Sequence, residues 1–461
     1  MVGFEEMRDE LLERIEDLLK RKQYTALRDL LADLEPADIA SLFEDLDEDS
    51  IPLLFRLLPK EPAAEVFVEL DPDAQEMLIR GFSNTELKEV LDELYLDDAV
   101  DIVEEMPANV VRRILSQADP QMRKEINEIL RYPENSAGSI MTTEYVSLRP
   151  GMTVEESILR IRRTGVDKET IYTCYVTRDR TLVGLVTVKD LLLAKDDEMT
   201  IEEIMETNVI SVNTLTDQEE VAQMFSKYNF LALPVTDAEN RMVGIITFDD
   251  AMDVMADEAT EDMEIMGGMT PSDKTYLRST VFDLFRHRIP WLLLLMVSAT
   301  FTGLIITGFE TALSAQVALT AFIPMLMDTG GNSGSQSSVT VIRALSLDEV
   351  EFSDLARIVW KEIRTAVLCG ITLAAACFVK ILLIDRLALG NDKITVMVAL
   401  VVCITMALTV LVAKVIGCSL PMFAKKLGFD PAVMASPFIT TIVDAISLLV
   451  YFGVAHLLLH L

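Results

Sequence analysis

Long apolar runs fill the C-terminal part of the chain. Ile289–Phe309 and Ile394–Ala413 contain no charged residue, and Thr365–Ile384 contains a single lysine near its end. Roughly 20 apolar residues suffice for a helix to cross the hydrocarbon core of a bilayer. Thr311–Ile342 is apolar at both ends, and Val433–Ala455 carries one charge. The pattern therefore predicts five membrane-spanning helices.

The second of these runs is interrupted by Asp328–Ser338, which is rich in glycine, serine and amide side chains. Gly330, Gly331 and Gly334 weaken a helix at this point. Irregular backbone at membrane depth is tolerated only inside protein or beside a water-filled cavity. A seam of small residues between packed helices is the alternative, and both interpretations stay open.

In residues 1–131 the apolar side chains recur at helical spacing. Leu34 and Leu58 open similar units 24 residues apart, and each unit has proline near its start. Proline is favoured in the first turn of a helix. Such units predict short helices stacked in a superhelical array.

Residues 137–256 contain an internal repeat. Each copy ends on a Gly-x-x-Thr-x-x-Asp motif, and Gly184 and Gly244 stand 60 residues apart. The order of apolar runs predicts strand, strand and helix, with Thr and Asp at the last strand-to-helix turn. The repeat resembles a tandem cystathionine-β-synthase (CBS) domain pair.

Members of the CBS group often bind adenosine nucleotides between the two copies. The resemblance makes Asp190 and Asp250 candidates for the ribose hydroxyls, with Phe230 beside the purine and ATP as the implied ligand. A helix N-terminus at this turn can attract phosphate. An aspartate before a helix also acts as a simple N-cap, so a purely structural role stays open.

The chain is expected to be a multidomain membrane protein. An all-α superhelical domain covers residues 1–131, and an α/β tandem CBS pair covers 132–200 and 201–256. An acidic connecting helix follows at 257–286, and a transmembrane domain with five spans covers 287–461.

Charge is distributed unevenly along the chain. Residues 287–461 hold eleven basic and eleven acidic side chains, so the net charge of −34 lies in residues 1–286. An acidic surface argues against nucleic acid and favours cations as partners. Basic residues next to the apolar runs indicate cytoplasmic N-terminal domains and a C-terminus outside a multi-pass cell membrane.

Eight acids lie between Asp249 and Glu264, and no lysine or arginine occurs between Arg241 and Lys274. Like charges one helical turn apart repel. Divalent cations that bridge this helix to another acidic surface would relieve the repulsion. A solvated acidic helix between domains is the alternative.

Asp444 lies in the middle of the last apolar run, where it is the only charge. A carboxylate at this depth is costly, and it usually faces protein or water and marks an ion path. Small and hydroxyl residues such as Thr440 and Ser447 flank it. A buried acid bonded to a neighbouring helix is the alternative.

The order of parts resembles the MgtE family of bacterial magnesium channels. The resemblance covers essentially the whole chain and is carried by the segments 132–138, 258–262, 330–336 and 436–444. It implies a homodimer in which Asp444 holds a hydrated Mg²⁺, with Asn332 and Thr440 nearby. The chain departs from the family at Asn229, where members can carry an acid.

The resemblance also implies gating by intracellular Mg²⁺, which would lock the connecting helix between acidic surfaces. The expected regulatory ligands are Asp97, Asp98, Glu219, Asp250, Glu258, Glu261, Asp262 and Asp430. Hard oxygen ligands of this kind suit Mg²⁺.

The leading hypothesis is therefore a Mg²⁺-selective channel for magnesium uptake, not an enzyme. A CBS-regulated transporter of another divalent cation or of an organic anion is the first alternative. An intramembrane enzyme that uses Asp328 and Asp444 is the second. Ion flux discriminates among the three hypotheses.

Overall fold

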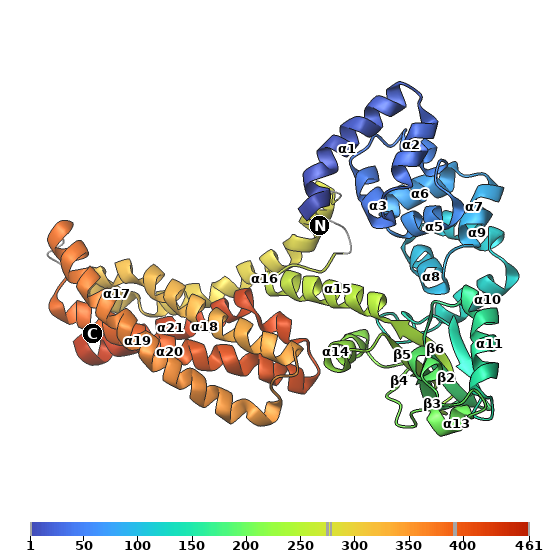
Figure 1. Cartoon of the computed structure of the whole chain (residues 1–461). Helices are drawn as coiled ribbons and strands as arrows, with labels where there is room; N and C mark the ends of the chain where they lie inside the picture. The colour runs from blue at the N-terminus through green and yellow to red at the C-terminus, as the bar shows by residue number, and fades with distance from the viewer. Residues whose placement is uncertain (1, 273–275, 277–278, 391–393, 460–461) are drawn as a thin grey trace. The chain divides into compact units, whose positions relative to one another are not determined.

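A computed structural model describes residues 2–272, 276, 279–390 and 394–459. The chain divides into two compact units, residues 1–255 and 256–461 (Figure 1).

Short helices fill the first part of the N-terminal unit. Their bounds are α1 Val2–Lys20, α2 Tyr24–Leu31, α3 Pro36–Glu44, α4 Ile51–Phe55, α5 Lys60–Val68, α6 Pro72–Gly81, α7 Asn84–Leu91, α8 Leu96–Glu105, α9 Ala108–Gln117 and α10 Pro120–Ile129. Pro36, Pro72 and Pro120 occupy the first helical position, as their missing N–H allows. Helix α5 packs between α3 and α7, and α9 packs on α7, which gives the expected stacking.

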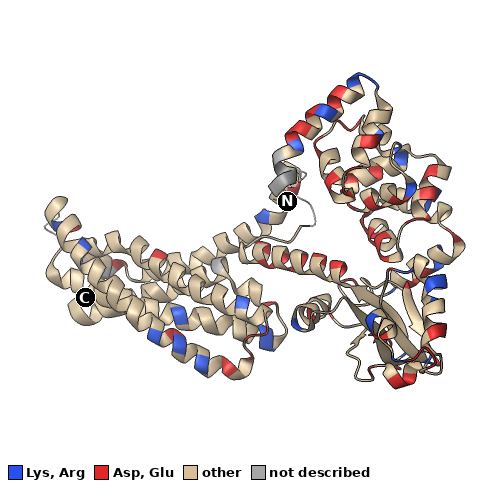
Figure 2. Ribbon diagram, viewed as in Figure 1, with Lys and Arg blue, Asp and Glu red and all other residues tan. Residues whose placement is uncertain are grey.

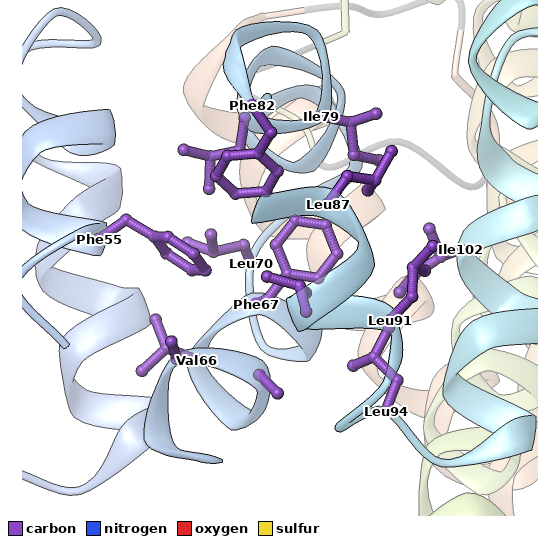
Figure 3. Close-up of a cluster of buried hydrophobic side chains, with 14 of the residues drawn as sticks. Phe55, Val66, Phe67, Leu70, Ile79, Phe82, Leu87, Leu91, Leu94 and Ile102 are labelled. Carbon is purple, nitrogen blue, oxygen red and sulfur yellow. The ribbon is translucent and has the colours of Figure 1, made fainter. Parts of the chain in front are cut away.

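Apolar side chains from successive helices form one core in this region. The rings of Phe55, Phe67 and Phe82 meet at centroid distances of 5.3 to 6.3 Å (Figure 3). Such tilted and edge-on contacts are the favoured geometries of aromatic pairs. A helix of this length is marginal alone, so the shared core holds the array together.

The repeat has the expected form in both copies. The first copy contains β1 Tyr145–Leu148, α11 Val154–Thr164, a 3₁₀ turn Gly165–Asp167, β2 Thr170–Arg178, β3 Thr181–Thr187 and α12 Val188–Leu192. The second contains α13 Ile201–Ile204, β4 Val212–Asn213, α14 Gln218–Tyr228, β5 Ala232–Thr236, β6 Met242–Thr247 and the start of α15 Phe248–Met266. In each three-stranded sheet the first pair is parallel and the second antiparallel.

The opening segment of each copy joins the sheet of the other copy. Thr142 and Ile245 exchange backbone hydrogen bonds of 2.8 and 2.9 Å, and Leu185 and Glu206 exchange two of 2.9 Å. The repeated glycine permits this approach. A Cβ atom at Gly244 would lie 2.6 Å from the carbonyl oxygen of Thr142, so any larger residue would push the segment away.

The C-terminal unit is helical. Its elements are the end of α15, α16 Val281–Gly308, α17 Glu310–Ala315, a 3₁₀ turn Val317–Phe322, α18 Ile323–Ser346, a 3₁₀ turn Phe352–Asp354, α19 Leu355–Lys380, a π-helical continuation Ile381–Ala388, α20 Val396–Leu427, a 3₁₀ turn Pro431–Met434 and α21 Ser436–Leu459. Helix α18 packs against α20 and α21, and α19 packs against α20.

Four described helical segments are long and apolar enough to cross a membrane: 281–308, 352–388, 396–427 and 431–459. Helix α18 is a fifth long helix, and its polar central stretch sets it apart from these four. Residues 328–338, all of which the structure describes, are helical throughout. The irregular backbone expected in this Gly-rich segment is therefore not found there. Close packing of the glycines overrides their low helix propensity.

Two helices extend beyond the bounds expected from the apolar runs. Helix α20 continues to Leu427, so Lys414 lies within a helix and not in a loop. Helix α19 begins at Leu355, which means that residues 355–363 lengthen the third predicted span. Lys414 is buried within α20, whereas Arg357, Lys361 and Arg364 of α19 are exposed. Helix α15 begins at Phe248 and ends at Met266.

Candidate functional site

The face of α21 that carries Asp444 packs against the glycines of α18. Thr440, Asp444 and Ser447 share this face because residues three and four apart are neighbours on a helix. A Cβ atom at Gly330 would lie 2.8 Å from Ser447 Oγ, and one at Gly331 would lie 2.8 Å from Thr440 Cγ2. The glycines therefore let the hydroxyl-bearing face of α21 approach the backbone of α18.

Several oxygen atoms on α20 and α21 are buried without a hydrogen-bond partner among the described residues. They are Asp444 Oδ1, Ser447 Oγ, Thr405 Oγ1 and Thr409 Oγ1. Thr409 and Ser447 also line a narrow crevice between α20 and α21. Leaving a buried polar atom unpaired costs about 1–3 kcal/mol. The site thus offers unused oxygen ligands around a carboxylate, the chemistry that a hard cation requires.

A second polar surface runs along α18. Asp328, Asn332, Gln336 and Thr340 recur every four residues and are all exposed in the single chain. Asp328 is close enough to Asp444 for the two charges to interact. A stripe of polar side chains at membrane depth does not face lipid without a large cost. It therefore faces water or another protein surface.

The end of α15 packs against the inner end of α18. Ser346 donates a hydrogen bond of 3.1 Å to Asp262 Oδ2. Ile265 and Met266 pack against Ile342. Burial raises the pKa of Asp262, and the nearby charge of Asp430 raises it further. Two of the expected regulatory ligands, Asp262 and Asp430, therefore lie near each other.

The roles of the other acids in this region differ. Asp430 Oδ1 accepts a hydrogen bond of 2.7 Å from the Ala432 backbone and so caps a 3₁₀ turn. Glu258 and Glu261 lie on α15 with Asp262. Figure 2 shows the row of acidic residues along this helix.

A separate acidic cluster lies in the N-terminal unit, where α8 meets the repeat pair. Its members are Asp97, Asp98 and Asp101 on α8, Glu144 and Glu169 directly before strands β1 and β2, and Asp249 and Asp250 in the first turn of α15. The Leu96 backbone donates a hydrogen bond of 3.3 Å to Glu144 Oε2. This bond joins the helical array to the first copy of the repeat.

Burial and mutual repulsion raise the pKa values of this cluster. Burial raises the pKa of Asp98 to about 7, and the charges of Asp250 and Asp249 add to the rise. Burial, again with Asp250 and Asp249, raises the pKa of Glu169 to about 8. A carboxylate that loses hydration among other carboxylates favours its neutral form. A bound cation would reverse that preference.

Three further members behave in the same way. Burial raises the pKa of Asp97 well above its ordinary value, with help from Asp250. Burial raises the pKa of Asp250 to about 6 against the lowering effect of its hydrogen bond from Thr247. Lost hydration and Asp250 raise the pKa of Asp101 to about 7, although part of the Asp101 side chain is exposed.

The sequence indicated Asp97, Asp98 and Asp250 but missed Glu144 and Glu169. Their position at the start of strands that pair at Tyr145 and Thr170 brings them together. Within the part of the chain that the structure describes, no three carboxylate, histidine or cysteine side chains are arranged to hold a metal ion. The expected regulatory ligands stay predictions.

Glu219 lies in the first turn of α14, on the second copy of the repeat. That helix ends at Tyr228 and is capped by Asn229, whose φ of 56° places it in the left-handed region. Asparagine tolerates this conformation better than most residues. The helix end therefore gives a structural reason for asparagine at the position where the family can carry an acid.

The candidate nucleotide residues have structural partners of their own. Asp190 accepts a hydrogen bond of 3.0 Å from the Thr187 backbone, and Asp250 accepts one of 3.2 Å from Thr247. In the first copy Thr187 is the helix cap and Asp190 completes a capping box. In the second copy the hydroxyl of Thr247 also donates a hydrogen bond to Asp250. The ring of Phe230 stacks on Tyr228 at 5.3 Å.

An open pocket of about 480 Å³ lies mainly in the first copy of the repeat and takes one lining residue, Leu231, from the second copy. It is lined by Tyr172, Thr173, Thr187, Val188, Lys189, Leu192, Leu193 and Leu231. The pocket is next to Asp190 in the chain, but its lining does not include Asp250 or Phe230. This pocket thus does not gather the three candidates.

An acidic helical domain, a CBS pair and a bundle of apolar helices with a carboxylate inside it define a multi-pass membrane protein of the cation-transport class. Residues 34–135 match the MgtE intracellular N domain, and residues 137–197 and 201–257 match the CBS domain. Residues 323–454 match MgtE, described as a divalent cation transporter.

Relatives extend the match over nearly the whole chain. The magnesium transporter MgtE of Thermus thermophilus is 37% identical over 98% of this chain and 99% of its own length. The magnesium transporter MgtE of Bacillus subtilis is 33% identical over 98% of each chain. The protein belongs to the MgtE family.

Solved structures match the cytosolic part. One is the cytosolic domain of the Mg²⁺ channel MgtE in complex with ATP, with 39% identity and a TM-score of 0.50 over 53% of this chain and 99% of that one. A second is the soluble part of a magnesium transporter, with 33% identity and a TM-score of 0.50 over 55% of this chain and 99% of that one.

Proposed function

We propose that this protein carries Mg²⁺ into the cell through a pore beside Asp444. The observation that supports the proposal most directly is the buried, unpaired Oδ1 atom of Asp444, together with the unpaired hydroxyl of Ser447 on the same face of α21. Mg²⁺ prefers octahedral oxygen ligands and loses its water reluctantly. One carboxylate with several hydroxyls suits a partly hydrated ion better than a closed cage of protein ligands would.

The pore forms at the axis of a homodimer in this proposal. Asn332 lies on the exposed polar stripe of α18, and Thr440 packs against the neighbouring Gly331. Two copies that face each other across this stripe would remove it from lipid and line an aqueous path with amides and hydroxyls. Asp444 from each copy would then face one ion.

Intracellular Mg²⁺ closes the pore in the same proposal. The raised pKa values in the cluster around α8 mean that the acids repel when they ionise together. Mg²⁺ ions would neutralise that cluster and the acids of α15. Because α15 bonds to α18 through Asp262 and Ser346, a change in α15 would reach the helix that carries Asn332.

Flux measurements test the pore. The full-length protein is placed in liposomes, and Mg²⁺ entry is followed with an indicator dye. We expect Asp444→Ala to lower the flux about tenfold or more, because a charged contact with the ion is lost. Asp354→Ala, an acid in a 3₁₀ turn outside the pore, is the matched control. Normal flux through Asp444→Ala would refute the pore site.

The gate is tested by neutralising Glu258, Glu261 and Asp262 together. We expect the triple variant to conduct at millimolar Mg²⁺ on the cytosolic side, where the unchanged protein closes. Three exposed acids of α1, Asp9, Glu10 and Glu13, are changed together as a control. Equal inhibition of both variants would contradict closure by ions on α15.

The remaining alternatives concern the ion and the nucleotide. Competition of Co²⁺ and Ca²⁺ with Mg²⁺ in the same liposomes separates a magnesium channel from a transporter of another divalent cation. ATP at the CBS pair is part of the proposal because a relative was solved in complex with ATP. Binding of ATP to the full-length protein, measured by calorimetry, tests it.

In the membrane topology that we propose, residues 1–266 lie in the cytoplasm, five spans follow, and the C-terminus lies outside. Basic residues near the helix ends support this arrangement. A cysteine added after Leu461 should react with an impermeant maleimide on intact cells, whereas one added before Met1 should not.

A further inference from the structure

Three polar side chains from three helices meet inside the C-terminal unit. Lys414 Nζ on α20 donates a hydrogen bond of 3.2 Å to Ser337 Oγ on α18. Ser337 Oγ donates one of 2.6 Å to Glu362 Oε2 on α19. The ammonium and carboxylate groups are 3.8 Å apart, and their side chains are only 6% and 16% exposed.

A buried ion pair of this kind is not a cheap way to stabilise a bundle. Two charges lose hydration when they are buried, and apolar residues of similar volume are often as stable or more so. At membrane depth the loss is greater. The pair does fix the orientation of α18, because the serine hydroxyl of that helix must lie between the two charged groups.

The three residues lie beside a point where α18 and α20 cross in close backbone contact. A Cβ atom at Gly417 would lie 2.2 Å from the carbonyl oxygen of Gly334. Ser337 follows Gly334 by nearly one turn, and Lys414 precedes Gly417 by nearly one turn. The crossing therefore brings the two side chains together, and the hydrogen bonds in turn fix how α18 is rotated and shifted against α20 and α19.

The two ends of α18, before and after Ser337, make different contacts. Asn332 lies before it, on the exposed polar stripe. Ser346 lies after it and bonds to Asp262 of α15. Any rotation of α18 about its axis would move the polar stripe, and Ser337 stands between the two ends.

We propose that Lys414, Ser337 and Glu362 form a polar clamp that positions α18 for selective ion passage. They are positioning residues and do not touch the ion themselves. The inference rests on the proposed pore along α18 and adds to it the device that sets the orientation of the pore-lining face.

The test uses two variants of the full-length protein in liposomes. Ser337→Ala removes the central hydroxyl and keeps both charges, and the double variant Lys414→Gln, Glu362→Gln removes both charges together. Ser419→Ala is the control, since its hydroxyl donates to Val415 of its own helix. The half-saturating Mg²⁺ concentration and the ratio of Mg²⁺ to Ca²⁺ flux are measured, with the melting temperature recorded for each variant.

We expect Ser337→Ala and the double variant to change the flux ratio or the half-saturating concentration by about threefold or more, the scale of one lost hydrogen bond. Ser419→Ala should leave both unchanged. A merely structural clamp would lower the melting temperature or the yield and leave both quantities as they were, and that result overturns the proposal. If the double variant does not fold, Ser337→Ala alone decides.

Failure of the clamp differs from failure of the pore. If Asp444→Ala reduces flux while Ser337→Ala transports with the normal ratio and half-saturation, the clamp is wrong and the pore stands. If Asp444→Ala transports normally, the proposed pore is wrong, whatever Ser337→Ala does.

Discussion

The acidic cluster around α8 should make the stability of the N-terminal unit depend on pH, and the magnitude can be worked out from the pKa values. The pKa of Asp98 rises from its ordinary 3.8 to about 7 on folding. A raised carboxyl pKa means that the folded state prefers the neutral acid. Its contribution to stability is therefore fully present below pH 3.8 and is lost as the pH rises through 7.

The difference corresponds to about 4 kcal/mol when Asp98 is taken alone. Neighbouring acids share the effect and part of the side chain is hydrated, so we expect about half, roughly 2 kcal/mol. Mg²⁺ bound at the cluster would offset this loss of stability, because it would neutralise the ionised carboxylates. The pH dependence should therefore be strong without Mg²⁺ and weak at millimolar Mg²⁺.

The assay is urea unfolding of residues 1–266 between about pH 5 and about pH 8, with and without Mg²⁺. Without Mg²⁺ the free energy of unfolding should fall as the pH rises. Asp98→Asn should reduce that fall by roughly 2 kcal/mol and should gain less from added Mg²⁺. Asp73→Asn, an exposed acid in the first turn of α6, is the matched control.

Two results would refute the reasoning. The first is stability that stays level or increases with pH in the absence of Mg²⁺. The second is Asp98→Asn behaving like Asp73→Asn under every condition. Either would mean that the cluster ionises without penalty, and repulsion among these acids could then not open the gate that we propose.

Gly417→Ala should destabilise the C-terminal unit, because its Cβ atom would meet a backbone oxygen at 2.2 Å. Such overpacking costs about 1–3 kcal/mol, which exceeds the gain of up to ~1 kcal/mol in helix propensity. Thermal unfolding in detergent should show a lower melting temperature for Gly417→Ala but not for the control Gly453→Ala, where the space around the glycine is open. Gly244→Ala should lower the free energy of unfolding of the repeat pair in urea by a similar amount, whereas Gly151→Ala should leave it unchanged. Equal effects of the two substitutions would contradict the role given to the close backbone approach at Gly244. Burial raises the pKa of Asp262, so Asp262→Asn should make channel closure less dependent on pH, and an unchanged pH profile of flux would count against ion binding there.

Much of the architecture could be predicted from the sequence, because the membrane and the repeat impose strong patterns. Apolar runs revealed the long helices, and the recurring glycine motif revealed the CBS pair. Asp444 stood out because a lone carboxylate in an apolar run has few explanations. These features depend on neighbours in the chain or on a fixed repeat distance.

Features that depend on distant contacts could not be predicted. Glu144 and Glu169 are ordinary acids in the sequence, and only the pairing of β1 with β2 brings them to the cluster. Lys414 directly follows the apolar run that ends at Ala413, where a basic side chain usually marks the end of a span. Its partners Ser337 and Glu362 are 77 and 52 positions away, and no local pattern links the three.

The Gly-rich stretch shows the same limit from the other direction. Local propensity predicted a weakened helix around Gly330. In the structure, Thr409, Val443 and Ser447 pack so closely on that position that only glycine fits. Tertiary packing thus decided both the residue type and the helical conformation.

The exchange of opening segments between the two CBS copies has a consequence for biosynthesis. Residues around Thr142 leave the ribosome about 100 positions before Ile245, with which they pair. The first copy likewise lacks its edge until Glu206 has been made. Neither copy completes its sheet from its own residues alone, so the two copies are expected to fold as one cooperative unit. A truncated chain that stops after the first copy would expose an unfinished sheet edge, a ready target for aggregation and quality-control proteases.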